Sequence, residues 1–184
     1  MSGLKPDETM PWCPVHLLDA GETAIWWGRP DLWKYAFRRT WGAVVVGAVC
    51  VVTGGIALHA MLKLDSVFAA LVGGMLSGGF AVFGVWMSVS CIRERYEEAK
   101  RVTYLVTDRR AVIERPSTVF SLDWPAVKFV ELAYESDERG DVIFYEHIVD
   151  SSDGPSRTQE GFIAVSNAAA VAREMRRLRS LAAA

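Results

Sequence analysis

Two long uncharged apolar segments constrain this chain more than any other feature. Residues 41–62 and 66–92 contain no Asp, Glu, Lys or Arg, and only residues 63–65 separate them. At a rise of 1.5 Å per residue, about 20 helical residues cross the hydrocarbon core of a bilayer. A surface helix of a soluble protein has a polar face on every turn, and neither segment has one. The sequence therefore predicts two transmembrane helices.

Two other interpretations of these segments fit less well. Two helices buried in a soluble protein would need more surrounding chain than the rest of the 184 residues provides. A cleaved signal peptide would have a short hydrophobic region followed by a cleavage site, and the first segment begins about 40 residues into the sequence without one. We therefore expect a hairpin of helices in a membrane.

The positions of the Lys and Arg residues predict how this hairpin is oriented. The connection at 63–65 is too short for anything but an antiparallel turn, so both chain ends lie on one side. Cations flank the hairpin on that side, at Arg29, Lys34, Arg38, Arg39, Arg93, Arg95, Lys100 and Arg101, whereas the connection offers only Lys63. This bias predicts that both termini are cytoplasmic. Aromatic residues before the first segment are expected in the headgroup layer, namely Trp33, Tyr35, Phe37 and Trp41.

Small residues recur at spacings of about four along both segments. Such stripes allow two helix backbones to approach closely in lipid. They predict either packing of the hairpin against itself or docking on another membrane protein, with self-packing the simpler alternative. The candidate packing residues are Ala43, Gly47, Gly55, Ala70, Gly74 and Gly78.

After residue 92 the sequence alternates between apolar and polar residues, as short antiparallel strands do. Strands are predicted at 102–106, 111–114, 118–122, 129–134, 142–149 and 160–165, with a polar turn at 136–141 and an exposed loop at 150–159. Ser166 is the expected N-cap of a helix through residue 181, in which Val171, Met175 and Leu178 share one face.

These elements predict a membrane helical hairpin joined to an α+β domain. In this domain a small antiparallel β-barrel is closed by the C-terminal helix. The expected organisation is an N-terminal segment at 1–40, the hairpin at 41–92 and the α+β domain at 93–184.

Composition and motifs argue against several functions. A net charge of −2 excludes a generally basic nucleic-acid binder. Three widely spaced cysteines form neither a disulfide framework nor a zinc site, and we expect no metal and no cofactor. The sequence contains no phosphate-binding loop, no pair of metal ligands on one helix and no nucleophile motif. The protein is therefore expected to be no enzyme and to have no small-molecule substrate. The acidic segments 135–141 and 150–160 would repel anionic headgroups.

Two short motifs on either side of the hairpin carry a resemblance to a known family. Residues 21–30 read GETAIWWGRP and residues 104–110 read YLVTDRR. Together with the hairpin between them and Gly161-Phe162-Ile163 before the last helix, they resemble the bacterial pleckstrin-homology-like (bPH) membrane proteins. The candidate interface residues within the motifs are Trp26, Trp27, Gly28, Arg29, Pro30, Tyr104, Thr107, Asp108 and Arg109. All of these also suit turns or aromatic packing, which is the simpler interpretation.

The resemblance implies a PH-like barrel carried by a hairpin in the bacterial inner membrane, and it implies no particular ligand. Because some members of that family are linked to assembly of photosynthetic complexes, it also points to a non-enzymatic accessory or assembly subunit of a respiratory or photosynthetic membrane complex. Its partners would be membrane lipids and another integral membrane protein. The alternative is a lipid-responsive PH-like module, for which a homo-oligomer is one option.

Overall fold

The structure, a computed structural model, describes residues 10, 12–61, 63, 67–136, 139–151 and 154–183. The chain forms two compact units. One comprises the chain up to Tyr35 together with the chain from Glu98 onward, and we call it the domain. The other spans Ala36–Glu97, and we call it the hairpin. The predicted boundaries at 40 and 92 lie close to these limits, but the structure joins the N-terminal segment and the C-terminal part of the chain into one unit.

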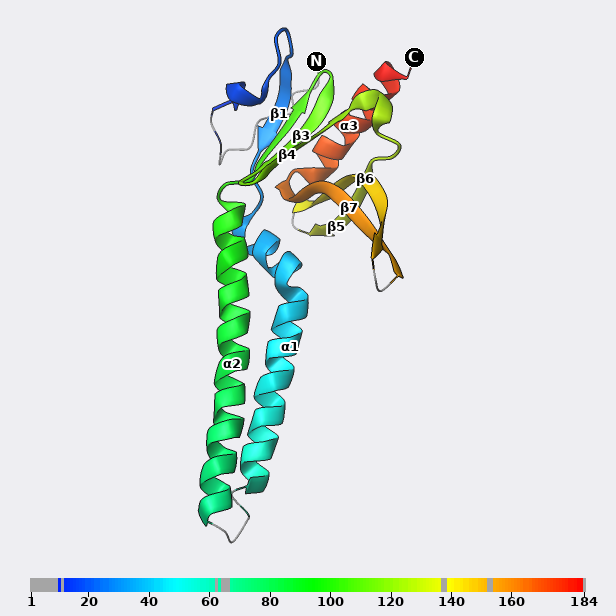
Figure 1. The fold of residues 1–184 in the computed structure, drawn as a ribbon. Coiled ribbons are helices and arrows are strands. Elements are labelled where there is room, and N and C mark those ends of the chain that lie inside the picture. The colour runs from blue at the N-terminus through cyan, green and yellow to red at the C-terminus, as the bar shows by residue number, and fades with distance from the viewer. Residues whose placement is uncertain are drawn as a thin grey trace. The chain divides into compact units, whose positions relative to one another are not determined.

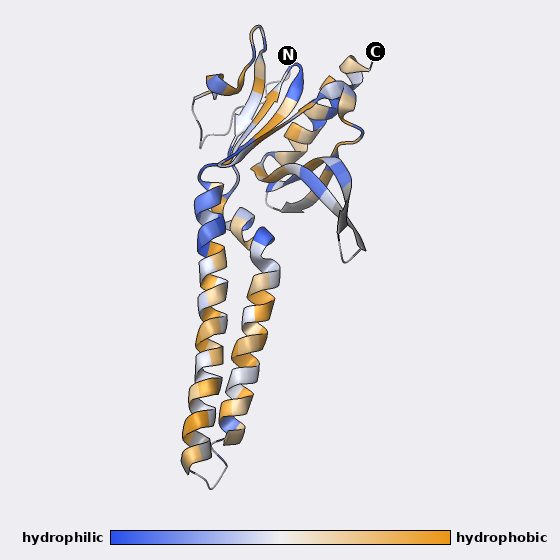
Figure 2. Ribbon diagram, viewed as in Figure 1, coloured by the Kyte–Doolittle hydropathy of each residue, from blue (hydrophilic) through white to orange (hydrophobic). Residues whose placement is uncertain are grey.

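Two long helices make up the hairpin, α1 (Leu32–Met61) and α2 (Val67–Ala99). Both are long and apolar enough to cross a membrane, and only a small share of each is buried inside the chain. Figure 2 shows how hydrophobic residues continue along both helices. Each helix also extends beyond its apolar segment into charged sequence, because Lys, Arg and Glu are good helix formers. The predicted turn at 63–65 lies largely outside the described residues.

In the described residues, the domain contains seven strands in two antiparallel sheets (Figure 1). The first sheet has the order β1-β2-β3-β4, with β1 (Ala24–Gly28), β2 (Thr103–Thr107), β3 (Arg110–Arg115) and β4 (Thr118–Asp123). The second has the order β5-β6-β7, with β5 (Glu131–Ser136), β6 (Arg139–Ser151) and β7 (Gly154–Ser166). The C-terminal helix α3 (Ala168–Ala182) contacts β5 and β6. Short 3₁₀ turns, η1 (Val15–Leu17) and η2 (Trp124–Ala126), complete the elements.

Strand β1 was not predicted. It precedes the hairpin in the sequence, whereas its partner strand β2 follows the hairpin. Trp26 pairs with Val106 and Gly28 pairs with Tyr104, so β1 is the edge strand next to β2. The hairpin is therefore inserted between two neighbouring strands of one sheet. This long-range pairing is invisible to any analysis of local periodicity.

The two sheets do not close into the predicted barrel, since no strand of one sheet pairs with a strand of the other in the described part of the chain. Between β4 and β5 the chain passes through η2, where Pro125 has no N–H to donate to a ladder. The α+β class, the antiparallel strands and the C-terminal helix are confirmed.

Two further details of the sequence prediction were wrong. The loop expected at 150–159 is largely strand, because β6 and β7 stay paired as far as Ser151 and Gly154. Backbone hydrogen bonds alone sustain such a ribbon, so polar side chains do not end it. The helix α3 is capped by Asn167 rather than Ser166, and Asn tolerates the left-handed backbone found there, with φ 53°.

The core of the domain draws on both parts of the chain that flank the hairpin. Trp26 from β1 is 1% exposed and its ring packs against Phe162 of β7, with centroids 5.9 Å apart. The predicted apolar face of α3 is buried, including Val171, Met175 and Leu178. Gly161 permits the close approach of β7 to β6, because a Cβ there would lie 2.8 Å from the Ile143 Cα.

We predict that a fragment beginning at Arg93 does not fold, because it lacks β1 and the buried Trp26 ring. A chain in which a short Gly/Ser linker joins residue 35 to residue 98 should fold, since the Tyr35 hydroxyl already lies 3.0 Å from the Glu98 Oε1. Thermal unfolding by circular dichroism distinguishes them. Within the linked chain, Trp26→Ala should reduce the free energy of unfolding by about 3–5 kcal/mol. A cooperative transition from the Arg93 fragment would contradict the prediction.

Candidate functional site

The two sequence motifs, at 21–30 and 104–110, contact each other directly. Glu22 from the first motif and Arg110 from the second form a bidentate ion pair, with the Arg110 Nε 3.0 Å from the Glu22 Oε1 and its Nη2 3.0 Å from the Oε2. The Glu22 side chain is only 1% exposed and that of Arg110 is 18% exposed. Arg110 also pairs with Asp19 at 2.8 Å. The motifs thus form a clamp that holds the N-terminal segment to the β2–β3 turn.

Hydrogen bonds complete the surroundings of the Glu22 carboxylate. The Thr107 hydroxyl donates to its Oε1 at 2.7 Å, and the Asp19 backbone N–H donates to its Oε2 at 2.8 Å. Burial by itself would raise the pKa of Glu22, but the hydrogen bonds from Arg110, Thr107 and Asp19 outweigh it and lower the pKa to about 2. Glu22 is therefore a carboxylate at any physiological pH, which suits a structural clamp rather than proton transfer.

The remaining residues of the second motif bind the same N-terminal segment. Asp108 accepts a hydrogen bond from the Thr23 N–H at 2.9 Å and donates its own N–H to the Thr23 carbonyl at 3.1 Å. The Arg109 guanidinium donates to the carbonyl of Gly21 at 3.4 Å. Gly21 has a φ of +77°, where a side chain would be strained. Thr107, Asp108 and Arg109 thus all make contacts within the chain.

The aromatic residues of the first motif lie in the domain. Trp26 is part of the core, and the Trp27 indole N–H donates to the Met10 carbonyl at 2.9 Å. Strand pairing directs the Trp26 ring inward, so this candidate residue is not accessible to a membrane or to a partner. Tyr104 is buried as well, with its hydroxyl accepting a hydrogen bond from the Ile163 N–H at 3.2 Å.

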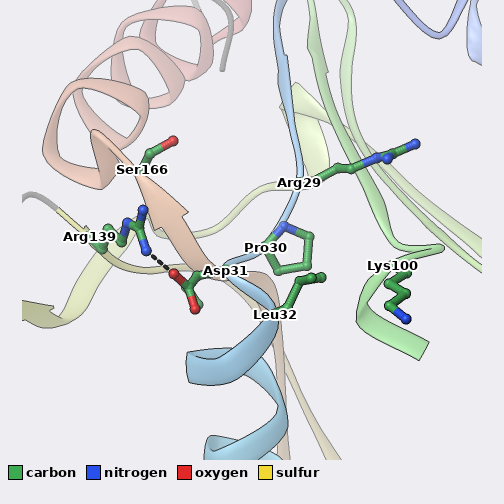
Figure 3. A pocket seen from close by; sticks show the side chains of 8 residues that line it. Arg29, Pro30, Asp31, Leu32, Lys100, Arg139 and Ser166 are labelled. Carbon is green, nitrogen blue, oxygen red and sulfur yellow. Dashed lines mark ion pairs between the residues drawn. The ribbon is translucent and has the colours of Figure 1, made fainter. Parts of the chain in front are cut away.

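A cavity of about 310 Å³ lies where the chain leaves β1 for α1 (Figure 3). Its lining residues are Arg29, Pro30, Asp31, Leu32, Lys100, Arg139, Ala164 and Ser166. All of them belong to the domain, although they are spread over four parts of the sequence. Arg29 and Pro30 are among the candidates predicted from the sequence, but no sequence pattern groups them with Lys100 and Arg139.

One wall of this cavity is formed by a strained part of the backbone near the end of β7. Ala164 has a φ of 54°, an unusual value for a residue with a side chain. The buried Asp141 carboxylate accepts a hydrogen bond from the Ala164 N–H at 2.9 Å, and the Ala164 carbonyl accepts one from the Asp31 N–H at 2.9 Å. These bonds fix the start of α1 to the end of β7.

The cavity carries an excess of positive charge. Asp31 is its single acidic residue, against Arg29, Lys100 and Arg139. Both carboxylate oxygens of Asp31 are engaged, because Oδ1 accepts from the Lys34 N–H at 3.0 Å and Oδ2 pairs with Arg139. Arg29 also lines a second cavity, of about 390 Å³, together with Arg101, Glu114 and Arg115, and Arg115 is paired with Glu160. The Nε atom of Arg29 is buried and has no hydrogen-bond partner in the described residues. The arrangement is suited to binding an anion.

The small residues of the hairpin divide into two groups. A Cβ on Gly47 would collide with the Ser88 hydroxyl, and one on Gly54 would lie 2.8 Å from the Ser77 carbonyl oxygen, so both positions face α2. Gly55 and Gly78 have nothing within 4 Å of such a Cβ. Gly74 makes ordinary contact with Leu58, and the Ala43 carbonyl accepts from the Ser88 hydroxyl at 3.4 Å. The side chain of Ala70 lies outside the described residues.

The residues that carry the clamp and part of the hairpin contact were not predicted from the sequence. Glu22 and Arg110 stood inside the quoted motifs, and their opposite charges were the available signal. Gly73 and Gly84 also face α1, since Cβ atoms there would lie 2.6 Å from Met61 Cγ and 2.7 Å from Cys50 Cβ. No regular spacing distinguishes these glycines from the outward-facing ones.

Comparison with known proteins yields no match to a family model, to a curated protein or to a solved structure.

We predict that Glu22→Gln reduces the free energy of unfolding at pH 7 by about 2 kcal/mol. This is less than the roughly 3–5 kcal/mol lost on breaking a fully buried pair, because Arg110 remains partly exposed. The pKa of Glu22 in the folded protein lies below the value of about 4.3 for an unfolded chain, so its contribution is complete above about pH 5 and is lost as the pH falls toward 2.

The measurement is thermal unfolding of the full chain in detergent between pH 7 and pH 3. The difference between wild type and Glu22→Gln should narrow as the pH falls. Glu131→Gln removes an exposed carboxylate and serves as the control, with little expected effect at either pH. A difference that stays constant with pH would contradict the assigned role of Glu22.

Proposed function

We propose that this chain is a non-enzymatic accessory or assembly subunit of a larger membrane protein complex, and that it belongs with the bPH membrane proteins. The seven antiparallel strands with a C-terminal helix support the PH-like assignment, although the sheets remain open. The contact between the two motifs supports it further, because the residues that carry the resemblance meet in the folded domain. The membrane assignment is supported by two helices of sufficient length and apolar character.

The observation that carries this proposal is the second group of small residues on the hairpin. Gly47, Gly54, Gly73 and Gly84 account for the packing of α1 against α2. Gly42, Gly55, Gly78 and Gly79 have open space where a side chain would be, so self-packing does not require them. In lipid, where burial of apolar surface does not drive helix association, such positions allow another helix to approach closely. A neighbouring membrane protein is the partner that would use them.

The orientation is part of the same proposal. The cations that precede the first apolar segment and follow the second would hold the domain and both termini in the cytoplasm. The complex would then be located in the bacterial inner membrane. A respiratory or photosynthetic complex is the partner that we favour, through the family resemblance.

A lipid-responsive PH-like module is the second candidate. The specific observation in its favour is the cavity lined by Arg29, Lys100 and Arg139, because cations near a membrane surface attract anionic lipid. In this case the hairpin would serve as a membrane attachment, and no stoichiometric protein partner would be needed.

We predict that Gly55→Leu abolishes partner binding and leaves the hairpin intact. The tagged chain, purified in a mild detergent, should carry a stoichiometric membrane partner that the variant loses. Ala57→Leu adds similar bulk at an exposed position on another face of α1 and should retain the partner. Gly54→Leu should instead disrupt the hairpin, because it faces Ser77 and Ala81. Recovery of the wild-type chain as a monomer would contradict the proposal.

The orientation predicts that alkaline phosphatase fused after residue 184 is inactive, whereas a green fluorescent protein fused at the same point is fluorescent. The physical reason is that alkaline phosphatase folds only in an oxidising compartment. Fusions within residues 63–65 should give the opposite pattern. An active phosphatase at the C-terminus would overturn the assigned orientation.

A further inference from the structure

We infer that the cavity between the ends of β1 and β7 binds the phosphate group of an anionic phospholipid, with Arg29 as the principal contact. This inference rests on the membrane part of the proposed function and is independent of any protein partner. Its starting point is the charge of the cavity, three cations against one acid whose two carboxylate oxygens are already engaged.

Arg29 is the residue whose surroundings call for an anion. Its Nε is buried without a hydrogen-bond partner in the described residues. A buried charged donor without an acceptor is costly, and native proteins satisfy such groups. A phosphate accepts two parallel hydrogen bonds from a guanidinium, which makes it a suitable acceptor.

The arrangement of the side chains separates Arg29 from the Arg139–Asp31 ion pair. In Figure 3 the Arg139–Asp31 pair lies on one side of Pro30, and Arg29 and Lys100 lie on the other. An anion beside Arg29 and Lys100 would therefore not face the Asp31 carboxylate directly. Pro30, Leu32 and Ala164 add apolar surface to the cavity, which suits the glycerol and upper acyl region of a lipid better than a fully hydrated anion.

Position along the chain favours a lipid over a soluble phosphate. Leu32 begins α1 nine residues before the apolar segment at 41–62, and Lys100 follows the end of the segment at 66–92 by eight residues. At 1.5 Å per residue these stretches reach at most about 14 Å from the hydrocarbon edge. The headgroup layer occupies roughly 5–8 Å of this distance, and an Arg or Lys side chain extends across much of the rest.

The test is native mass spectrometry of the full chain in detergent micelles that contain phosphatidylglycerol or phosphatidylcholine. The expected result is preferential retention of phosphatidylglycerol by the wild type. Arg29→Gln should lower this retention about fivefold, the effect of removing one cation near an anionic lipid. Arg29→Lys keeps the charge and should lose less. Arg173→Gln, which removes an exposed cation from α3, is the matched control and should bind as the wild type does. Circular dichroism of each variant verifies its fold.

Each other outcome has a definite meaning. Equal retention of the two lipids, or equal losses in Arg29→Gln and Arg173→Gln, would overturn the inference. Displacement of phosphatidylglycerol by millimolar inorganic phosphate would show that a free phosphate, rather than a lipid, is the ligand, and would overturn the lipid assignment. Flotation of the full chain with vesicles separates the two proposals, because a chain that does not float contradicts the membrane assignment itself, whereas one that floats without lipid preference contradicts only this inference.

Discussion

The antiparallel pairing of β1 with β2 is the contact on which the domain depends, because it joins two segments that the whole hairpin separates in sequence. β1 supplies the edge strand of the first sheet and brings Trp26 into the core beside Phe162. A hairpin that is already formed shortens the effective loop between the two strands, so the entropy lost on pairing them is smaller than the number of intervening residues implies. Folding of the domain and formation of the hairpin should therefore support each other.

The clamp between Glu22 and Arg110 reinforces this connection at the other end of the strand pair. It satisfies a carboxylate that is almost fully buried and gives the preceding N-terminal segment a fixed place on the β2–β3 turn. The candidate interface residues Thr107, Asp108 and Arg109 make their contacts around this clamp, inside the chain. The cavity next to the start of α1 is a separate place, lined by Arg29, Lys100 and Arg139.

The hairpin and the cavity offer two surfaces with different chemistry. The outward-facing glycines present a surface that favours close van der Waals contact between helices, and such contact does not depend on charge. The cavity presents cations close to the expected headgroup layer, where electrostatic attraction and hydrogen bonding dominate. One chain can therefore contact a protein through its spans and a lipid through its domain, and neither contact requires a catalytic group.

The sequence by itself determined the features that depend on local pattern. The apolar segments specified the two long helices, alternation specified six of the seven strands, and the spacing of Val171, Met175 and Leu178 specified the buried face of α3. Its errors fell where polar side chains suggested a loop but backbone pairing extended a strand, as at 154–159. Only the tertiary structure decided the role of β1, the Glu22–Arg110 pair, the open sheets and the grouping of Arg29 with Lys100 and Arg139. These features depend on contacts between residues far apart in the chain, and local periodicity carries no information about which distant segments meet.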